Sequence, residues 1–203
     1  MATASDDPEQ VLHFWFGEPD ANGFADEEHQ ARWWRKDPAF DQLVRDRFAA
    51  LHEAVLAGRR DDWLAAARGR LAFIVVLDQF SRNMFRGSAR MHAGDARACD
   101  AAIEGIERAM DRALVHSERS FFYMPLMHSE TLADQDLCVE LVTRWRDEVS
   151  GVWRERVAQF LPYAEQHRDI VRRFGRFPHR NAILGRVSTP EELAFLSQPG
   201  SSF

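Results

Sequence analysis

The sequence predicts an all-α protein, a compact bundle of about eight antiparallel helices. Apolar residues recur at spacings of three and four over most of the chain, as on one face of a helix. Several of these segments follow a helix start signal, in which aspartate or threonine precedes proline. No segment alternates as a strand with sheet partners would. With 203 residues, 45% of them hydrophobic, we expect one domain over residues 1–203, with disordered tails at 1–7 and 198–203.

Three helices are expected in the first part of the chain, over residues 8–16, 26–34 and 38–57. The first and the third begin with Asp-Pro, which places a capping carboxylate before a proline at the first helical position. Gly17 and Gly58 then end these two helices, since glycine is the common residue after a helix C-terminus. The third helix has apolar residues on one face, from Phe40 to Val55.

The stretch "GRLAFIVVLDQFSRNMF", residues 69–85, is apolar on all sides. Its β-branched residues are compatible with a buried strand, but a strand requires partners that the chain does not offer. We therefore expect a helix at the centre of the domain.

Five further segments complete the predicted bundle. Residues 94–114 are rich in alanine and amphipathic, and 134–149 also have helical spacing. Ser117 opens a helix that Pro125 is expected to kink or break, and 151–174 form a long helix that contains Pro162. The capping pattern Thr-Pro-Glu-Glu from Thr189 starts the last one. Short connections favour antiparallel neighbours.

Composition excludes several classes of protein. The net charge of −6 disfavours a nucleic-acid coat, which requires a broad basic surface. The longest apolar run has seven residues, too few to cross a bilayer, and the N-terminus has no secretion signal. Two cysteines without CxxC spacing indicate no disulfide framework. We expect a cytoplasmic protein that does not enter membranes.

A basic stretch, "HRDIVRRFGRFPHRN" (167–181), stands out in this acidic chain. Gly175 and Pro178 restrict the loop after the long helix, so that its side chains are held in place. Guanidinium groups on such a loop suit a carboxylate or phosphate, because each can bind two oxygen atoms. In the alternative interpretation, the arginines neutralise helix ends and acidic side chains of neighbouring helices.

Polar residues in two other segments also require an explanation. Asp78 and Gln79 end the apolar stretch, and Arg82 and Asn83 follow at helical spacing, either as a structural ion pair or as groups in a cleft. The segment His128-Ser129-Glu130 comes after Pro125 and could supply an acid/base pair or a structural histidine. It has no G-x-S-x-G turn.

No metal site or cofactor is expected. The chain has no HExxH, cysteine cluster or EF-hand loop, and His92 with Asp95 is a weak pair. "HRD" at 167–169 lacks the asparagine and the other motifs of a kinase.

Several long blocks together resemble the bacterial domain-of-unknown-function family 924. They are "VLHFWFGE", "WWRKDPAFDQLVRDRF", "LDQFSRNMFRG", "FFYMPLMHSE" and "HRDIVRRFGRFPHRNAILGR" followed by "STPEE". The resemblance covers residues 10–197 and implies a compact helical fold similar to tetratricopeptide-repeat proteins, with no reaction, substrate or cofactor. The chain has Ser81 where the family pattern has proline, and Met127 where it commonly has glutamate.

We therefore expect a polar cleft that binds an anionic small molecule, with catalysis left open. Proton transfer would fall to the catalytic candidates, and guanidinium and amide groups would hold the anion. A helical scaffold that binds an acidic peptide or a C-terminal carboxylate is the alternative. The oligomeric state is not predicted. The catalytic candidates are His128, Glu130, His167 and Asp78, and the ligand-binding candidates are Gln79, Arg82, Asn83, Arg173, Arg176, His179, Arg180 and Asn181.

Overall fold

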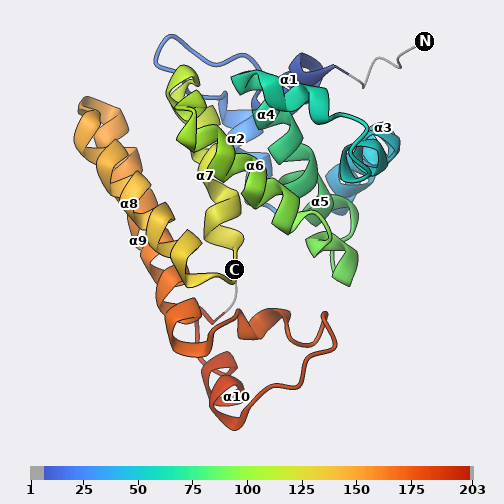
Figure 1. Cartoon of the computed structure of the whole chain (residues 1–203), viewed down its shortest axis with the longest axis vertical. Coiled ribbons are helices and arrows are strands. Elements are labelled where there is room, and N and C mark those ends of the chain that lie inside the picture. The colour runs from blue at the N-terminus through green and yellow to red at the C-terminus, as the bar shows by residue number, and fades with distance from the viewer. Residues whose placement is uncertain (1–6, 202–203) are drawn as a thin grey trace. The chain divides into compact units, whose positions relative to one another are not determined.

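The computed structural model describes residues 7–201, and over this range the regular structure is helical, which confirms the all-α prediction (Figure 1). The chain groups into two compact units, an N-terminal unit up to Arg86 with Arg90–Pro125, and a C-terminal unit of Gly87–Ala89 with the residues from Leu126 onward. The single domain thus stays a prediction. The predicted disordered tails lie mainly outside the described residues, and within residues 198–201 the Gly200 carbonyl accepts a hydrogen bond from Gln166.

The N-terminal unit begins with the three predicted helices. They are α1 (Pro8–Phe16), α2 (Glu27–Trp33) and α3 (Pro38–Leu56). The Asp7 and Asp37 carboxylates accept hydrogen bonds from backbone amides of the first turns of α1 and α3, as their Asp-Pro sequences predict. The apolar faces of α1 and α3 turn inward, and Val44, Phe48 and Val55 are fully buried.

The apolar stretch is a central helix, as predicted, but it is not a uniform α-helix. It starts as α4 (Ala67–Ile74), continues as the π-helical segment η2 (Val75–Phe80) and ends as α5 (Ser81–Met84). Every residue of η2 is buried, because α1, α3 and α6 pack around this helix. A π-helix closes its hydrogen bonds over one more residue than an α-helix, so Asp78 and Gln79 lie in widened turns.

The remainder of the N-terminal unit differs from the prediction at two places. The predicted helix 94–114 is divided into α6 (Asp95–Glu107) and the short 3-10 helix η4 (Met110–Ala113), because Ala109 between them has a φ of 54°. Pro125 lies inside α7 (His116–His128) and does not break it. The helix therefore continues to His128, three residues past the proline. Two more 3-10 helices connect the α-helices, η1 (Asp61–Ala65) and η3 (Ala89–His92).

The C-terminal unit contains a helical hairpin and a smaller C-terminal part. α8 (Leu132–Glu148) and α9 (Gly151–Phe174) are joined by two residues and lie antiparallel side by side (Figure 1). Gly175 ends α9 with a φ of 68°, and η5 (Pro178–Arg180) and α10 (Pro190–Leu196) follow. Ile170, Val171 and Phe177 form a small core here, on which Phe174 and Phe195 pack.

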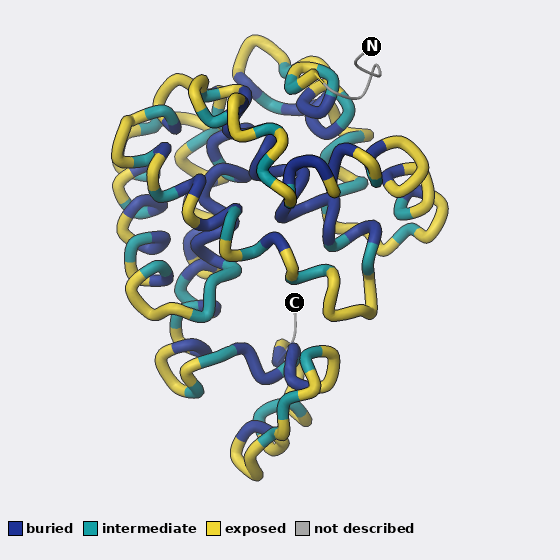
Figure 2. Tube along the Cα trace, turned by 45° about the vertical axis from the view of Figure 1, so that its right-hand side comes forward, coloured by how far each residue is buried: buried dark blue, intermediate teal, exposed yellow. Residues whose placement is uncertain are grey.

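Burial follows the helical pattern in both units. Along most helices the trace changes from buried to exposed within a turn (Figure 2). Cys99 and Cys138 are separate buried thiols, which agrees with the absence of a disulfide framework. None of the helices within residues 7–201 combines the length and apolar character needed to cross a bilayer.

Candidate functional site

The predicted polar residues of the N-terminal unit form a buried ion-pair network at the π-helical segment. Arg82 Nη1 lies 2.8 Å from Asp78 Oδ1 and 3.0 Å from Asp95 Oδ1. Gln79 Nε2 donates to Asp78 Oδ2 (2.5 Å), and Asp95 Oδ2 lies 3.0 Å from His92 Nδ1. Arg82 thus bridges two carboxylates, and the fully buried Asp78 carboxylate is surrounded by its own donors. Of the two interpretations that the sequence left open for Asp78 and Arg82, these contacts agree with the structural ion pair.

The electrostatics of this network favour a structural role. Burial by itself would lower the pKa of Arg82, but the charges of Asp78 and Asp95 outweigh it and raise that pKa. Asn83, predicted to join the same site, turns to another partner and donates to Asp41 Oδ1 (2.8 Å), which also binds Arg86. Each of these groups has a charge partner within the unit.

Ser81, at the position where the family pattern has proline, forms a hydrogen bond with His52. The distance from Ser81 Oγ to His52 Nε2 is 2.7 Å. Both side chains are almost fully buried, so no substrate reaches them, and burial lowers the pKa of His52. The pair links α3 to α5 and does not act as a nucleophile.

Two histidines and one arginine pack around Phe177 in the C-terminal unit, and a third histidine lies beside one of them. The His167 ring lies edge-on to Phe177 with centroids 5.6 Å apart, and the His179 ring is 5.5 Å from the same centroid. Arg180 places its guanidinium carbon 4.5 Å from that centroid, and His128 lies 6.5 Å from His167. We call His128, His167, His179 and Arg180 the imidazole cluster. All four are predicted site residues.

His167 is neutral in this setting. Its Nδ1 is 2.7 Å from the carbonyl oxygen of Tyr163, which can only accept, so Nδ1 carries the proton. Burial lowers the pKa of His167 to about 3, despite that hydrogen bond, and the nearby His128, Arg180 and His179 lower it further. The neighbours that lower the pKa of His167 are thus all basic side chains.

Glu130 lies close enough to Arg180 for their charges to interact, and it is firmly held. Its Oε1 accepts a hydrogen bond from the Phe177 amide (2.7 Å), and Arg186 donates to both carboxylate oxygens (2.6 and 2.9 Å). Partial burial opposes ionisation, but Arg186 and the Phe177 amide outweigh it and lower the pKa of Glu130. Glu130 thus positions the loop that carries Phe177, His179 and Arg180.

The other predicted residues of the basic stretch pair with acidic residues around α10. Arg176 donates to both carboxylate oxygens of Glu192 (2.7 and 2.9 Å), and Asn181 Nδ2 donates to the same group (3.2 Å). Together with the Thr189 amide, Arg176 lowers the pKa of Glu192 to about 2. Arg173 pairs with Glu191 at 2.9 Å. These contacts agree with the alternative interpretation, in which the arginines neutralise neighbouring acidic side chains.

Several members of these networks give only weak signals in the sequence. Asp95 forms a weak pair with His92, Glu192 belongs to a capping pattern, and Arg186 lies five residues after the basic stretch 167–181. Gln135 was missed completely, although its Nε2 donates to the Met127 and Ser129 carbonyls and so satisfies the end of α7 at His128. Helical spacing gives no signal for such contacts, because the partners come from different elements.

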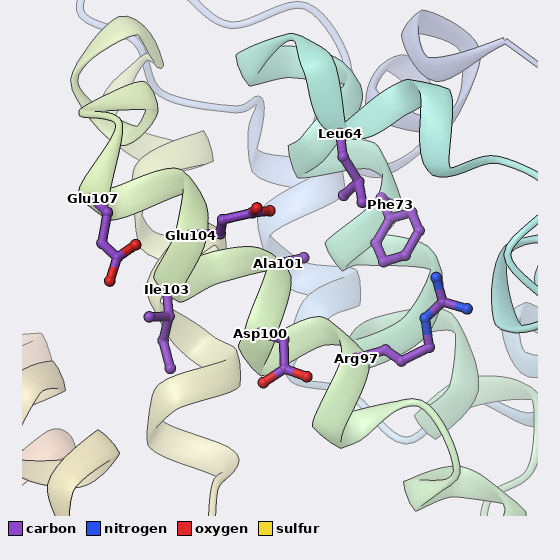
Figure 3. Close-up of a pocket in the computed structure, with 8 residues that line it drawn as sticks. All are labelled: Leu64, Phe73, Arg97, Asp100, Ala101, Ile103, Glu104 and Glu107. Carbon is purple, nitrogen blue, oxygen red and sulfur yellow. The ribbon is translucent and has the colours of Figure 1, made fainter.

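Two hollows lie elsewhere on the described surface. One, of about 410 Å³, belongs to the N-terminal unit and is bordered by η1, α4 and α6 (Figure 3). The other, of about 430 Å³, belongs to the C-terminal unit and has Ile170, Phe174 and Phe195 as apolar lining, with Glu165, Asp169 and Arg173 around them. Within residues 7–201, no group of three or more His, Cys, Asp or Glu side chains is arranged to hold a metal ion.

Comparisons with known proteins identify relatives without a described activity. A family model described as "Bacterial protein of unknown function (DUF924)" matches residues 11–200. A solved structure of a protein of unknown function from Agrobacterium tumefaciens is 39% identical, with a TM-score of 0.78, and the match covers 94% of this chain and 96% of that one. A comparison with curated proteins gave no significant match. The family match spans nearly the whole chain and agrees with the resemblance of the sequence blocks, so this chain belongs to the DUF924 family of bacterial proteins.

Proposed function

We propose that the protein binds a small anion, a carboxylate or phosphate, at the imidazole cluster of the C-terminal unit. One observation supports the proposal: the imidazoles of His167 and His179 and the guanidinium of Arg180 pack around the Phe177 ring, and His128 lies 6.5 Å from His167. The adjacent carboxylate, Glu130, is engaged by Arg186 and the Phe177 amide. A carboxylate or phosphate offers acceptors for the N–H groups of these rings and a charge partner for a guanidinium.

Access from solvent differs between the members of the cluster. His128 and His179 are half-buried, so they can meet a ligand, while His167 and Arg180 are only 7% and 8% exposed and lie deeper. A site of this kind desolvates part of the anion, which strengthens its hydrogen bonds. Histidine gains charge near neutral pH, and we therefore expect tighter binding at pH 6 than at pH 8.

Acid–base catalysis is the finer form of the proposal, and the geometry ranks its candidates. Glu130 is bound to a guanidinium and an amide, which makes it a weak base. His167 donates its Nδ1 proton to the Tyr163 carbonyl, and with a pKa of about 3 it is also a weak base near neutral pH. In this form of the proposal, the half-buried His128 moves the proton, His167 lies beside it, and Asp78, in the other unit, is structural.

The test is a calorimetric titration of the protein with inorganic phosphate at pH 6.5. Arg180→Gln and His179→Asn should each weaken phosphate binding about tenfold or more, since hydrogen bonds to charged groups contribute about 1.5–3 kcal/mol. The matched control is Arg172→Gln, which removes an exposed arginine of α9 that pairs with Asp169, and it should leave the affinity unchanged. A second titration with acetate shows whether the site prefers a carboxylate or a phosphate.

Two results would overturn the proposal. One is the absence of binding by either anion to the unmodified chain. The other is an equal loss of affinity in Arg172→Gln, which would indicate attraction by the general charge of α9. Circular dichroism and thermal unfolding show whether each variant folds. If Arg180→Gln does not fold, the phosphate affinity of His179→Asn tests the proposal, because His179 is only half-buried.

The scaffold alternative predicts an open groove for an acidic peptide. The hollow beside α9 and α10 is the candidate for such a groove, but Glu165 and Asp169 line it, and its Arg173 already pairs with Glu191. Its charge therefore disfavours an acidic peptide, and the anion site remains our proposal.

A further inference from the structure

The turn between α7 and α8 contains two residues on which the proposed anion site depends. His128 is the last residue of α7, and Glu130 follows before α8 begins at Leu132. The His128 ring lies 6.5 Å from the ring of His167, and Glu130 accepts a hydrogen bond from the Phe177 amide (2.7 Å). A residue that holds this turn therefore also determines where His128 and Glu130 lie.

One buried side chain of α8, Gln135, holds the turn. Its Nε2 donates hydrogen bonds to the carbonyl oxygens of Met127 (2.7 Å) and Ser129 (2.6 Å), the residues on either side of His128. Gln135 is fully buried, and within residues 7–201 its Oε1 makes no hydrogen bond, so the amide acts here as a donor. The backbone on both sides of His128 is thus bound to a single amide group.

A second contact from α8 holds the same turn closer to the surface. Ser129 Oγ donates to Asp134 Oδ2 (2.6 Å) and accepts a hydrogen bond from the Thr131 amide (3.1 Å). Ser129 and Asp134 are both only half-buried. Hydrogen bonds are stronger where water is excluded, so we expect Gln135 to hold the turn more firmly than Asp134 does.

Closure of the helix end does not by itself account for Gln135. The helices α1 and α9 are each followed by a glycine, Gly17 and Gly175, whose own backbone amide donates to a carbonyl of the last turn. No glycine follows His128 directly, and the donor comes from the side chain of another helix. The Gln135 oxygen lacks a partner among the described residues, which is unfavourable for stability.

We propose that Gln135 is a positioning residue of the anion site. It acts through His128, because it fixes the backbone from which that imidazole extends, and it does not touch the anion. Side chains that bind a ligand need such support from their neighbours to keep a precise geometry. This inference rests on the proposed function, since it concerns the same imidazole cluster.

The test is a calorimetric titration of Gln135→Met with inorganic phosphate at pH 6.5. Methionine has a similar length but no donor, so the variant loses both hydrogen bonds and should weaken phosphate binding about fivefold or more, as is typical of coupled residues. The matched control is Val142→Ala, which shortens a fully buried side chain about two turns further along α8. This control should destabilise the protein and leave the phosphate affinity unchanged.

Two further measurements distinguish positioning from a general loosening of the unit. If Gln135 acts through His128, Gln135→Met should not weaken phosphate binding further once His128→Asn has removed the imidazole. In the absence of phosphate, the NMR signals of the His128 ring should shift in Gln135→Met and not in Val142→Ala. If Gln135→Met does not fold, Ser129→Ala, which removes the outer contact, should cause a smaller shift of the same signals and a smaller loss of affinity.

Several results would overturn the inference while the proposed function stands. They are an unchanged phosphate affinity in folded Gln135→Met, an equal loss in Val142→Ala, and losses that add in the double variant with His128→Asn. If Ser129→Ala has to replace Gln135→Met, unchanged His128 signals and affinity have the same meaning. Absence of phosphate binding by the unmodified chain would instead refute the proposed function, and this inference with it.

Discussion

The two units each gather charged side chains, but they balance them differently. In the N-terminal unit, Arg82 lies between Asp78 and Asp95, so carboxylates outnumber guanidinium groups at the π-helical segment. In the C-terminal unit, the imidazole cluster contains four basic groups, and Glu130 nearby is occupied by Arg186. In the first arrangement the guanidinium has carboxylates beside it, while the second brings basic side chains together, of which His167 is neutral.

This difference shows that polar residues in a helical interior have two distinct uses. A buried carboxylate with its own guanidinium partner fixes how helices meet. Imidazoles beside a guanidinium offer several N–H donors to an anion, and the binding site proposed above rests on this arrangement. The composition of a polar cluster therefore says more about function than its size does.

The largest effect should come from the ion-pair network. Asp78→Asn removes one of the two carboxylates that pair with the Arg82 guanidinium. Because Asp78 is fully buried, the variant should destabilise the protein by about 3 kcal/mol. Urea unfolding measures this change. Asp136→Asn, which removes an exposed partner of Arg172, should change the free energy of unfolding by less than about 0.5 kcal/mol. Equal effects of the two variants would mean that the network is not structural.

Glu130→Gln should test whether Glu130 positions the loop that carries His179 and Arg180 in the C-terminal unit. The variant loses the charge-assisted bonds to Arg186 and the Phe177 amide, at a cost of about 1.5–3 kcal/mol in the free energy of unfolding. Phosphate binding should weaken, because the loop that carries His179 and Arg180 is held less firmly. Unchanged phosphate binding in a folded Glu130→Gln variant would contradict this positioning role.

His167 predicts how stability depends on pH. Its pKa falls from an ordinary value of 6.5 to about 3 in the folded protein, so between these values the unfolded chain binds more protons. Stability should therefore decrease as pH falls below 6.5, by up to about 1.4 kcal/mol per pH unit from this residue. His167→Gln should flatten that part of the curve. NMR of labelled histidine would detect a neutral ring at pH 5, and a charged ring at that pH would refute the prediction.

The smallest effect concerns the helix that holds the arginines of the C-terminal unit. Thr189 and Glu192 cap α10 reciprocally, and Thr189→Ala should destabilise it by about 1 kcal/mol. Thermal unfolding would record a small decrease in melting temperature, while Thr189→Ser should have little effect. A large loss of phosphate affinity in Thr189→Ala would connect α10 to the anion site.

Much of the fold was predictable because it depends on local signals. Asp7 and Asp37 cap the helices that their sequence predicts, and the Thr189 capping box forms as its spacing requires. Ala109, with positive φ, and Pro125, tolerated inside α7, could not be foreseen, because tertiary packing decides both. A helix can keep a proline where the missing amide bond costs less than unpacking its buried face.

The candidate site was predictable in its residue types but not in its partners. The sequence indicated that arginines and histidines of 167–181 belong together, and the structure describes His167, His179 and Arg180 around one phenylalanine. The sequence alone could not show that Glu192 pairs with Arg176, because that pairing depends on the path of the loop before α10. Whether residues of both units share one cleft stays a prediction.

The π-helical segment Val75–Phe80 has a consequence for how the chain tolerates change in length. An α-helix advances about 100° per residue, so one extra residue accommodated in a wide turn shifts the angular phase of everything after it. Deleting a single residue here would let the segment close as an ordinary α-helix and would swing Arg82 and Asn83 to other sides of the helix. In relatives in which this segment is one residue shorter, the side chains at the positions of Arg82 and Asn83 would thus need different hydrogen-bond and ion-pair partners.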